Sequence, residues 1–414
     1  MADLPDYDVM AGRLFLEFLR RTHLSAPSDV ATLVAEEAGA FGGSDVTIYL
    51  ADYEQRQLRP LPRAGQPQAE VLDIEGTLHG RAFATSGVVE TSSSSVGRRR
   101  LFLPLLDGTE RLGTMEVTVS APDGGVPNGI VTIAERFAHL AAQTIISKGL
   151  YGDVFERARR AQPMSVATEL TRGLLPPLVF ATEHLVISGM LEPAYDAGGD
   201  TFDYAVNDGT AHVAIFDAMG HGLAAAGDAN FAVAAYRAAR RRNLSLTETY
   251  AELDDAIRRQ PGDRYVTAVL AELDLGSGEL TWLSAGHPPP LLIRNAKFVK
   301  TLDAEPATPL GVAFGDDTPF VSSESLQPGD LVLLYTDGVP EARLSDGEFF
   351  TTARLAEFIE RQASAGTTAP ETLRRLRHAV LEHQQGHLQD DATALLIEWA
   401  HGAERKLVPD VAAP

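Results

Sequence analysis

Cysteine is absent from the sequence of 414 residues. Its absence excludes disulfide frameworks, thiolate metal sites, cysteine nucleophiles and thiol-based redox sensing. Long apolar runs are missing too, since none approaches the roughly 20 residues that a membrane span needs. The N-terminus lacks the basic and apolar regions of a secretion signal. We therefore expect a cytoplasmic protein that makes no membrane contact.

Positive charge is scarce, because 35 Lys and Arg stand against 57 Asp and Glu and give a net charge of −22. A surface this acidic repels phosphate backbones, so nucleic acid is not an expected partner. Carboxylates can hold cations, but acidity alone does not identify a metal site. Nucleophile elbows, Walker loops, kinase catalytic loops and dinucleotide fingerprints are also missing.

The length exceeds one ordinary core and suits two domains. Hydrophobic residues make up 44% and charged residues 22%, which is typical of globular proteins. We expect a first domain at residues 1–150, a helical linker at 151–180, a second domain at 181–400 and a frayed tail at 401–414. The predicted fold class is α+β for the chain as a whole.

The first domain reads as strands mixed with short helices. Its expected elements are a helix at 28–40, strands at 46–51 and 57–61, a helix at 76–85, and a hairpin of 100–106 and 112–119 closed by Asp107-Gly108. Residues 87–97 are polar and predict a loop. A long amphipathic helix begins at Gly129, and helical propensity continues to Leu175. This helical stretch either links the two domains or packs on its own domain.

The second domain alternates strand blocks with pairs of helices. Strands are predicted at 185–190, 201–207, 211–216, 265–273, 279–284, 290–294, 330–335 and 392–399, and helices at 223–242, 245–259, 352–364 and 370–383. Ser245 and Glu248 have the spacing of a capping box. This alternation favours sheets flanked by helices.

Four aspartates of the second domain lie beside strand ends: Asp200, Asp217, Asp337 and Asp390. Each alone is explained by a turn or a solvated loop, but strand ends at one edge of a sheet converge in space. Oxygen ligands without cysteine suit a hard divalent ion such as Mg²⁺ or Mn²⁺. The four together therefore predict a metal site.

Two histidines and two basic runs also stand out. His221 is interpreted as a core or capping residue, and His287 as structural support, with proton transfer left open. The basic runs are residues 98–100, and Arg237 with residues 240–242. Such runs are usually solvated, although either could steer an anionic substrate.

Seven sequence blocks in order resemble the SpoIIE/RsbU-type branch of the PPM metal-dependent protein phosphatases. They are PAYDAGGD (193–200), DAMGHG (217–222), YVT (265–267), SAGHP (284–288), PLG (309–311), LYTDGV (334–339) with EAR (341–343), and DDAT (390–393). The resemblance covers residues 180–400 and implies a four-layer αββα sandwich. Two departures stand out: Phe216 and Thr351 occupy positions where glycine is frequent in the family.

The resemblance implies two Mn²⁺ or Mg²⁺ ions and a site made of Asp200, Asp217, Ala218, Asp337 and Asp390. Asp217 would bridge both ions. Asp200 and the backbone carbonyl of Ala218 would complete the shell of one ion, and Asp337 with Asp390 would hold the other. The implied reaction is hydrolysis of a phosphoserine by a metal-activated water. The implied substrate is a phosphorylated protein, an anti-sigma-factor antagonist of STAS type.

Residues 25–150 resemble a GAF sensor domain by order of elements rather than by motif. The resemblance implies that the linker is a switch between sensor and phosphatase, and that paired helices make a homodimer. Two other interpretations remain: a catalytically silent pseudo-phosphatase or scaffold, and a metal-dependent phosphatase of a small phosphorylated metabolite.

Overall fold

The computed structural model describes residues 7–93, 95–121, 124–193, 195–196, 198–305, 307–312, 319–342, 349–384, 390–400 and 402–408. Contacts divide the chain into two units, Met1–Gln162 with Arg405–Pro414 and Pro163–Glu404. None of the helices in the described ranges is long and apolar enough to cross a bilayer.

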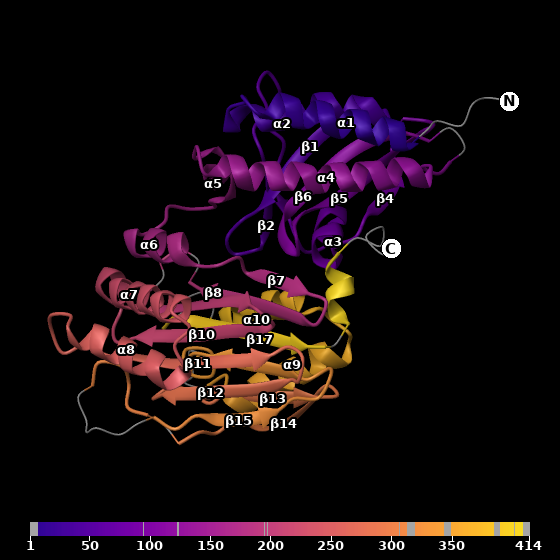
Figure 1. Ribbon diagram of the computed structural model, residues 1–414. Helices are drawn as coiled ribbons and strands as arrows, with labels where there is room; N and C mark the ends of the chain where they lie inside the picture. The colour runs from indigo at the N-terminus through magenta and orange to yellow at the C-terminus, as the bar shows by residue number, and fades with distance from the viewer. Residues whose placement is uncertain are drawn as a thin grey trace. The chain divides into compact units, whose positions relative to one another are not determined.

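The first unit is built on an antiparallel sheet of six strands in the order β3-β2-β1-β6-β5-β4 (Figure 1). Its strands are β1 (Ser44–Ala51), β2 (Gln57–Pro60), β3 (Leu72–Asp73), β4 (Val89–Ser92), β5 (Arg98–Asp107) and β6 (Glu110–Ser120). Its helices are α1 (Tyr7–Thr22), α2 (Val30–Glu37), α3 (Leu78–Thr85), α4 (Asn128–Gly149) and α5 (Val154–Arg159), with short 3₁₀ turns at Pro27–Asp29 and Ala38–Phe41. The helix α3 covers one face, and α1, α2 and α4 lie on the other.

The hairpin of β5 and β6 forms as predicted, with Asp107 opposite Glu110 across the Gly108 turn. Alternate residues of β5, such as Leu101 and Leu103, face the helix α4 and bury against Phe137. The period of two along the strand therefore gives this sheet one face for α4 and one for α3.

Three parts of this chain differ from the sequence-based expectations. Residues 87–97 were expected to be a loop, but Val89–Ser92 pairs with β5 as an edge strand. The helix α1 has no counterpart in the prediction. Residues 402–408 were expected to be frayed, but Ala403–Leu407 forms a 3₁₀ helix in which Leu407 is buried. Short polar strands and isolated helical turns depend on neighbours that local pattern does not reveal.

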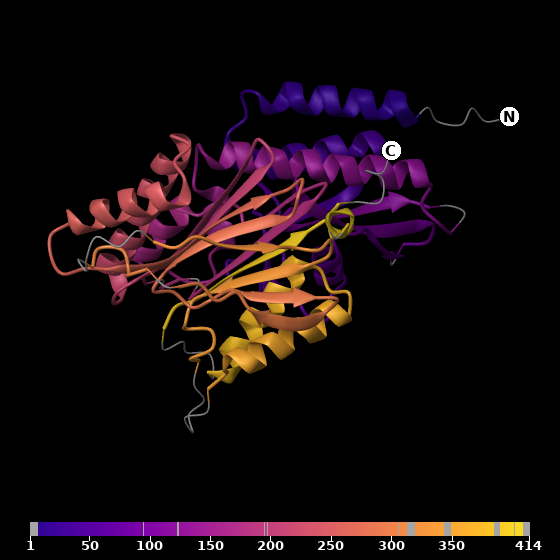
Figure 2. The same cartoon turned by 60° about the horizontal axis from the view of Figure 1, so that its bottom comes forward.

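The second unit contains two stacked antiparallel sheets with helices outside, the four-layer αββα sandwich that the resemblance implies (Figure 1, Figure 2). The first sheet has the order β15-β12-β11-β10-β9, and its strands are β9 (Asp200–Asn207), β10 (Thr210–Ala218), β11 (Val266–Asp274), β12 (Glu279–Ala285) and β15 (Ser322–Ser325). The second has the order β14-β13-β16-β17-β8-β7, and its strands are β7 (Val179–Thr182), β8 (Leu185–Glu192), β13 (Leu291–Arg294), β14 (Lys297–Thr301), β16 (Leu331–Tyr335) and β17 (Ala392–Trp399).

Helices cover the outer faces of both sheets. The first sheet carries α7 (Gly222–Arg241) and α8 (Leu246–Arg258), and the second carries α9 (Thr352–Ser364) and α10 (Ala369–His383). The capping box of Ser245 and Glu248 is confirmed at the start of α8. Between the sheets, side chains such as Phe202, Trp282 and Trp399 form one apolar core. A rigid sandwich of this kind fixes the positions of its strand ends.

A further helix, α6 (Val166–Leu174), belongs to the second unit and packs against α7. Thr168 and Thr171 are fully buried, and the Asn230 amide donates to the Thr171 hydroxyl at 3.3 Å. The part of the expected linker that follows Pro163 is thus docked on the sandwich.

Candidate active site

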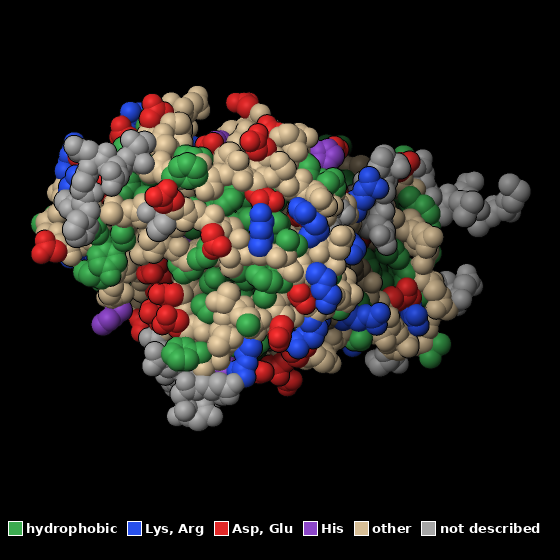
Figure 3. Space-filling model, turned by 90° about the horizontal axis from the view of Figure 1, so that it is seen from below, with side chains coloured by type: hydrophobic (Ala, Val, Ile, Leu, Met, Phe, Trp, Pro, Cys, Tyr) green, Lys and Arg blue, Asp and Glu red, His purple; other side chains and the backbone are tan. Residues whose placement is uncertain are grey.

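The four aspartates lie at neighbouring strand ends of the two stacked sheets. Asp200 begins β9 and pairs directly with Asp217, the last residue but one of β10. In the other sheet, Asp337 follows the end of β16 and Asp390 precedes the start of β17, and these two strands are neighbours. Figure 3 shows acidic side chains at several places on the face seen from below, one group of them at the left.

Asp217 lies at the centre of the interactions among these carboxylates. Burial raises the pKa of Asp217 to about 6, the charges of Asp337 and Asp390 add to the rise, and a hydrogen bond with Thr267 opposes it. The pKa of Asp337 is also raised, by burial and then by Asp390 and Glu341. Carboxylates from both sheets therefore repel one another at one place, which is the electrostatic condition that a bound cation relieves.

Asp200 is the most deeply buried of the four, with 2% of its surface exposed. Burial raises its pKa well above the usual value, and the charges of Asp391 and Asp217 add to this, while the hydrogen bond from Thr336 opposes it. The Thr336 hydroxyl donates to Asp200 Oδ2 at 2.6 Å and so fixes the orientation of the carboxylate. Asp200 is held by the other sheet, from which Thr336 comes.

Asp391 has a role that the sequence did not reveal, although it stands in the DDAT block. Its carboxylate accepts hydrogen bonds from the backbone N–H groups of Gly198, at 2.7 Å, and Asp200, at 3.2 Å. Burial raises the pKa of Asp391 to about 7 despite these bonds, and Asp390 and Asp217 contribute to the rise. Asp391 thereby ties the loop before β9 to the start of β17.

Two glycines allow backbone to approach the site closely. A Cβ on Gly199 would lie 2.2 Å from the carbonyl oxygen of Ala218, and one on Gly338 would lie 1.8 Å from that of Asp391. Such distances exclude any side chain, so both positions require glycine. The Ala218 carbonyl, which the resemblance proposes as a ligand, lies beside the loop that leads to Asp200.

A hydrogen-bonded series leads from Asp217 into the sandwich. The Thr267 hydroxyl lies 2.8 Å from His287 Nδ1, and His287 Nε2 lies 3.1 Å from the Tyr335 carbonyl oxygen. Burial lowers the pKa of His287 to about 4, so the ring is neutral and Nε2 donates to Tyr335. The single Thr267 proton then serves either His287 or Asp217. This geometry agrees with structural support by His287.

The other residues singled out by sequence have varied surroundings. His221 is exposed at the N-cap position of α7 and makes no capping bond through its side chain, so its interpretation as a core or capping residue is wrong. Arg237 and Arg240 bind the buried Asp203 rather than solvent. Arg99 and Arg100 pair with Glu90 and Glu116. Ala194, Ala197 and Arg343 of the quoted blocks lie outside the described residues.

The two departures from the family pattern have clear local consequences. Phe216 is fully buried against Tyr236, with ring centroids 5.9 Å apart, so it serves the packing of α7 on β10. Thr351 has φ of 65°, in the region that favours glycine, and its side chain caps α9 through Arg354 N–H. A β-branched residue there is strained, which accounts for the frequent glycine in the family.

The donor chemistry of the site fits divalent metal ions, because every candidate ligand is a carboxylate or a carbonyl oxygen. In the described ranges, no three His, Cys, Asp or Glu side chains are arranged to hold one ion together. Asp337 and Asp390 are exposed, so their side chains have room to reorient. The mutual repulsion around Asp217 is the observation on which this fit is based.

The chain is similar to a known protein family and to several known proteins. Residues 207–400 match the family described as Stage II sporulation protein E (SpoIIE). The chain is 22% identical over 367 residues to Protein IcfG of Synechocystis sp., covering 80% of this chain and 56% of IcfG. It is 24% identical over 236 residues to the phosphoserine phosphatase RsbU of Bacillus subtilis, covering 56% of this chain and 69% of RsbU. The chain thus spans little more than half the length of IcfG and about two thirds of RsbU.

Among solved structures, the RsbU and RsbW domains of a Mycobacterium tuberculosis protein match with 28% identity and a TM-score of 0.46, over 53% of this chain and 62% of that one. These matches do not test the resemblance of residues 25–150 to a GAF domain, and it stays a prediction.

Proposed function

We propose that this chain is a metal-dependent protein serine/threonine phosphatase. The premise is the match of residues 207–400 to the SpoIIE family. The observation that carries the proposal is the gathering of carboxylates at strand ends of both sheets. Asp200 and Asp217 pair across β9 and β10, and Asp337 and Asp390 lie at the adjoining ends of β16 and β17. The Thr336 hydroxyl joins the two sheets at Asp200, and the charges of Asp337 and Asp390 raise the pKa of Asp217. A purely structural role would not favour repelling carboxylates at one edge of a sandwich.

The proposed cofactors are two Mn²⁺ or Mg²⁺ ions. Asp217 would bridge them, Asp200 and the Ala218 carbonyl would bind one, and Asp337 with Asp390 would bind the other. Bound there, the ions would lower the pKa of a water molecule and neutralise phosphoryl charge. The chain's own contribution is orientation: Thr336 holds Asp200, and Asp391 holds the backbone of residues 198–200.

The proposed substrate is a phosphoserine protein, such as an anti-sigma-factor antagonist of STAS type. One argument is the likeness to a protein named phosphoserine phosphatase. Another is the apolar rim beside Asp217 and Ala218, where the side chains of Met219, Leu223 and Tyr265 are 45%, 56% and 37% exposed. An apolar rim suits a protein surface better than a small phosphorylated metabolite.

Regulation by the first unit and a homodimer are further parts of this proposal. The helix α6 exposes Val166 and Leu170, and Phe231 of α7 is exposed as well. Apolar side chains on two packed helices suit helix pairing between two copies of the chain. The cytoplasm remains the expected location.

Hydrolysis of an aryl phosphate tests the proposal. We expect turnover with Mn²⁺, none with EDTA, and a loss on the order of a hundredfold or more in Asp217→Asn, because a bridging ligand is lost. Asp208→Asn is the matched control, since Asp208 lies in the turn at the opposite end of the β9–β10 hairpin. Equal activity of Asp217→Asn and the wild type would overturn the site.

A second comparison separates the alternatives. A phosphatase of proteins should hydrolyse a phosphoserine STAS protein far faster than phosphosugars or nucleotides. Silence of the full chain and of residues 163–414 with every metal would instead favour the pseudo-phosphatase.

A further inference from the structure

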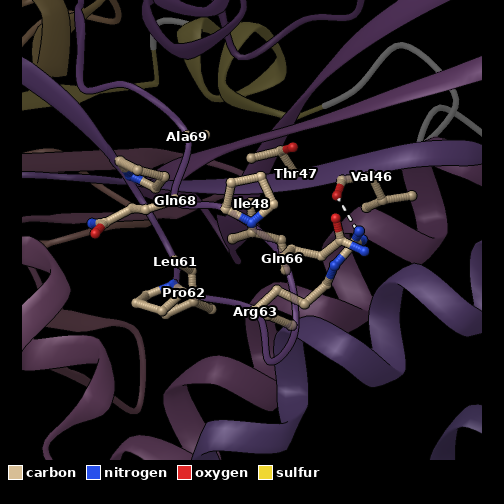
Figure 4. A pocket seen from close by; sticks show the side chains of 12 residues that line it. Val46, Thr47, Ile48, Leu61, Pro62, Arg63, Gln66, Gln68 and Ala69 are labelled. Carbon is tan, nitrogen blue, oxygen red and sulfur yellow. Dashed lines mark hydrogen bonds between the residues drawn. The ribbon is translucent and has the colours of Figure 1, made fainter.

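Two adjoining hollows lie beside β2 in the first unit. The outer hollow has a volume of about 450 Å³ and lies between β2, the segment after it and α5. The inner one has about 110 Å³ and lies under the same segment, against β1 (Figure 4). They share Pro60, Pro62 and Gln68. Together they form a concave surface of the size that small molecules occupy.

The lining of these hollows is positively charged. Arg59 and Arg157 line the outer hollow, and Arg63 lines the inner one. None of the described residues that line either hollow is Asp or Glu. In a chain with a net charge of −22 such a lining is unusual. The charge therefore favours an anionic occupant.

The arginines are held in place yet keep donors available. Arg59 Nε donates to the Ala158 carbonyl at 3.1 Å and Nη1 to Gln57 at 3.1 Å, which leaves Nη2 for a ligand. Arg63 Nη1 donates to the Val46 carbonyl at 3.1 Å, the dashed line of Figure 4. Arg157 is exposed, and its guanidinium has no partner in the described part of the chain.

Apolar side chains make up the rest of the outer hollow. They are Pro60, Pro62, Val71, Val154 and Ala158. Val71 is 42% exposed, and Pro62 is exposed as well, while Pro60 is buried. A ligand that pairs a charged group with an apolar body would satisfy both parts of the surface.

On the opposite face of the same sheet, which carries α3, the charged groups pair with one another. There Glu116 lies 3.0 Å from His79 Nε2 and accepts from Arg100 Nε at 2.6 Å, and His79 Nδ1 lies 2.9 Å from the Thr114 hydroxyl. These polar groups satisfy one another, so they leave no charge for a ligand.

We propose that the outer hollow binds an organic anion. Its carboxylate, sulfonate or phosphate group would pair with Arg59 and Arg157, and its apolar body would cover Pro60, Pro62 and Val71. Because three lining residues come from α5, the ligand holds that helix against β2. Existing attachments of α5 include the buried Phe155, the bond from Arg59 Nε to the Ala158 carbonyl at 3.1 Å and the bond from Arg159 Nε to the Ala51 carbonyl at 3.0 Å. The Tyr53 hydroxyl also donates to Glu156. The second unit begins at Pro163, four residues after the end of α5.

The probe for this site is 1-anilinonaphthalene-8-sulfonate, an aromatic sulfonate whose fluorescence rises in apolar surroundings. With the full chain we expect saturable binding that Arg157→Glu weakens about tenfold or more, since a charge-assisted contact is lost. The neutral analogue N-phenyl-1-naphthylamine should not distinguish the two proteins. Arg81→Glu, at an exposed position of α3, is the matched control and should bind the sulfonate as the wild type does.

Hydrogen exchange tests the effect on α5. The sulfonate should slow amide exchange at residues 154–159 severalfold in the wild type and not in Arg157→Glu. Absence of saturable binding, or equal affinity of Arg157→Glu and wild type, would overturn the site. Binding without slower exchange would overturn the clamping of α5. Neither readout requires turnover, so the result is independent of the proposed phosphatase activity.

Discussion

At the scale of single residues, the site depends on buried polar side chains. Each of them can be buried because it has a hydrogen-bond partner. Thr336 donates to Asp200, which lies 136 residues away in the sequence, and Thr267 lies beside His287, which is 20 residues away. Burial of such groups is costly without a partner. A change in the protonation of these residues therefore changes the free energy of unfolding as well as the chemistry of the site.

His287 makes this link measurable. Its folded pKa of about 4 lies below the ordinary value of 6.5, so the unfolded chain binds a proton first as the pH falls. The neutral imidazole of His287 makes its full contribution to the free energy of unfolding above pH 6.5. This contribution is lost as the pH falls from 6.5 to 4. Between pH 7 and pH 5, the free energy of unfolding of the second unit should fall by about 2 kcal/mol more in the wild type than in His287→Gln.

Urea unfolding followed by tryptophan fluorescence measures this difference, because both tryptophans, Trp282 and Trp399, lie in the core of the second unit. His23→Gln, at an exposed position of the first unit, should follow the wild type. An identical pH response of His287→Gln and the wild type would show that the imidazole is not held neutral.

At the scale of elements, α6 is anchored through α7 to the strand that begins with Asp200. Arg237 Nη2 donates to the Leu174 carbonyl at 2.5 Å and to Asp203 at 2.7 Å, and Arg240 donates to the same carboxylate at 2.8 Å. The Tyr204 hydroxyl donates to the Pro177 carbonyl at 2.7 Å. The end of α6 is thereby connected to β9 three and four residues from Asp200.

Replacement of Arg237 by methionine should destabilise the second unit by about 2 kcal/mol. Asp203 is almost completely buried, and the loss of one of its two cations leaves the charge only partly compensated. Arg242→Ala is the control, since its pair with Glu252 is exposed and should contribute less than about 1 kcal/mol. Equal unfolding midpoints of the two variants in urea would contradict the anchoring role.

At the scale of the whole molecule, the chain combines two units with separate cores. All of the candidate ligands lie in the second unit, and the proposed anion site lies wholly in the first. Because no residue belongs to both proposed sites, removal of the first unit should leave the metal requirement of the second unit unchanged.

Deletion of residues 1–162 should therefore change the rate of phosphate hydrolysis by severalfold while the Mn²⁺ concentration for half-maximal activity stays within about twofold. The physical reason is that the first unit contains none of the candidate ligands, while the chain runs on from it into α6. Steady-state kinetics of both forms over a Mn²⁺ series measure this. Identical rates under all conditions would remove the basis for regulation by the first unit.

The sequence by itself determined the helices and strands with strong periodicity. It also determined that each of the four aspartates stands beside the end of a strand. Both features depend only on residue spacing within one segment. The hairpin around Gly108 and the capping box of Ser245 are examples. Only the tertiary structure decided the role of Asp391, the exposure of His221 and the pairing of Arg237 with Asp203. Those depend on which distant backbone or side chain lies within 3 Å, and local pattern carries no information on that. The same reason explains why β4 was missed: its strand forms only beside β5.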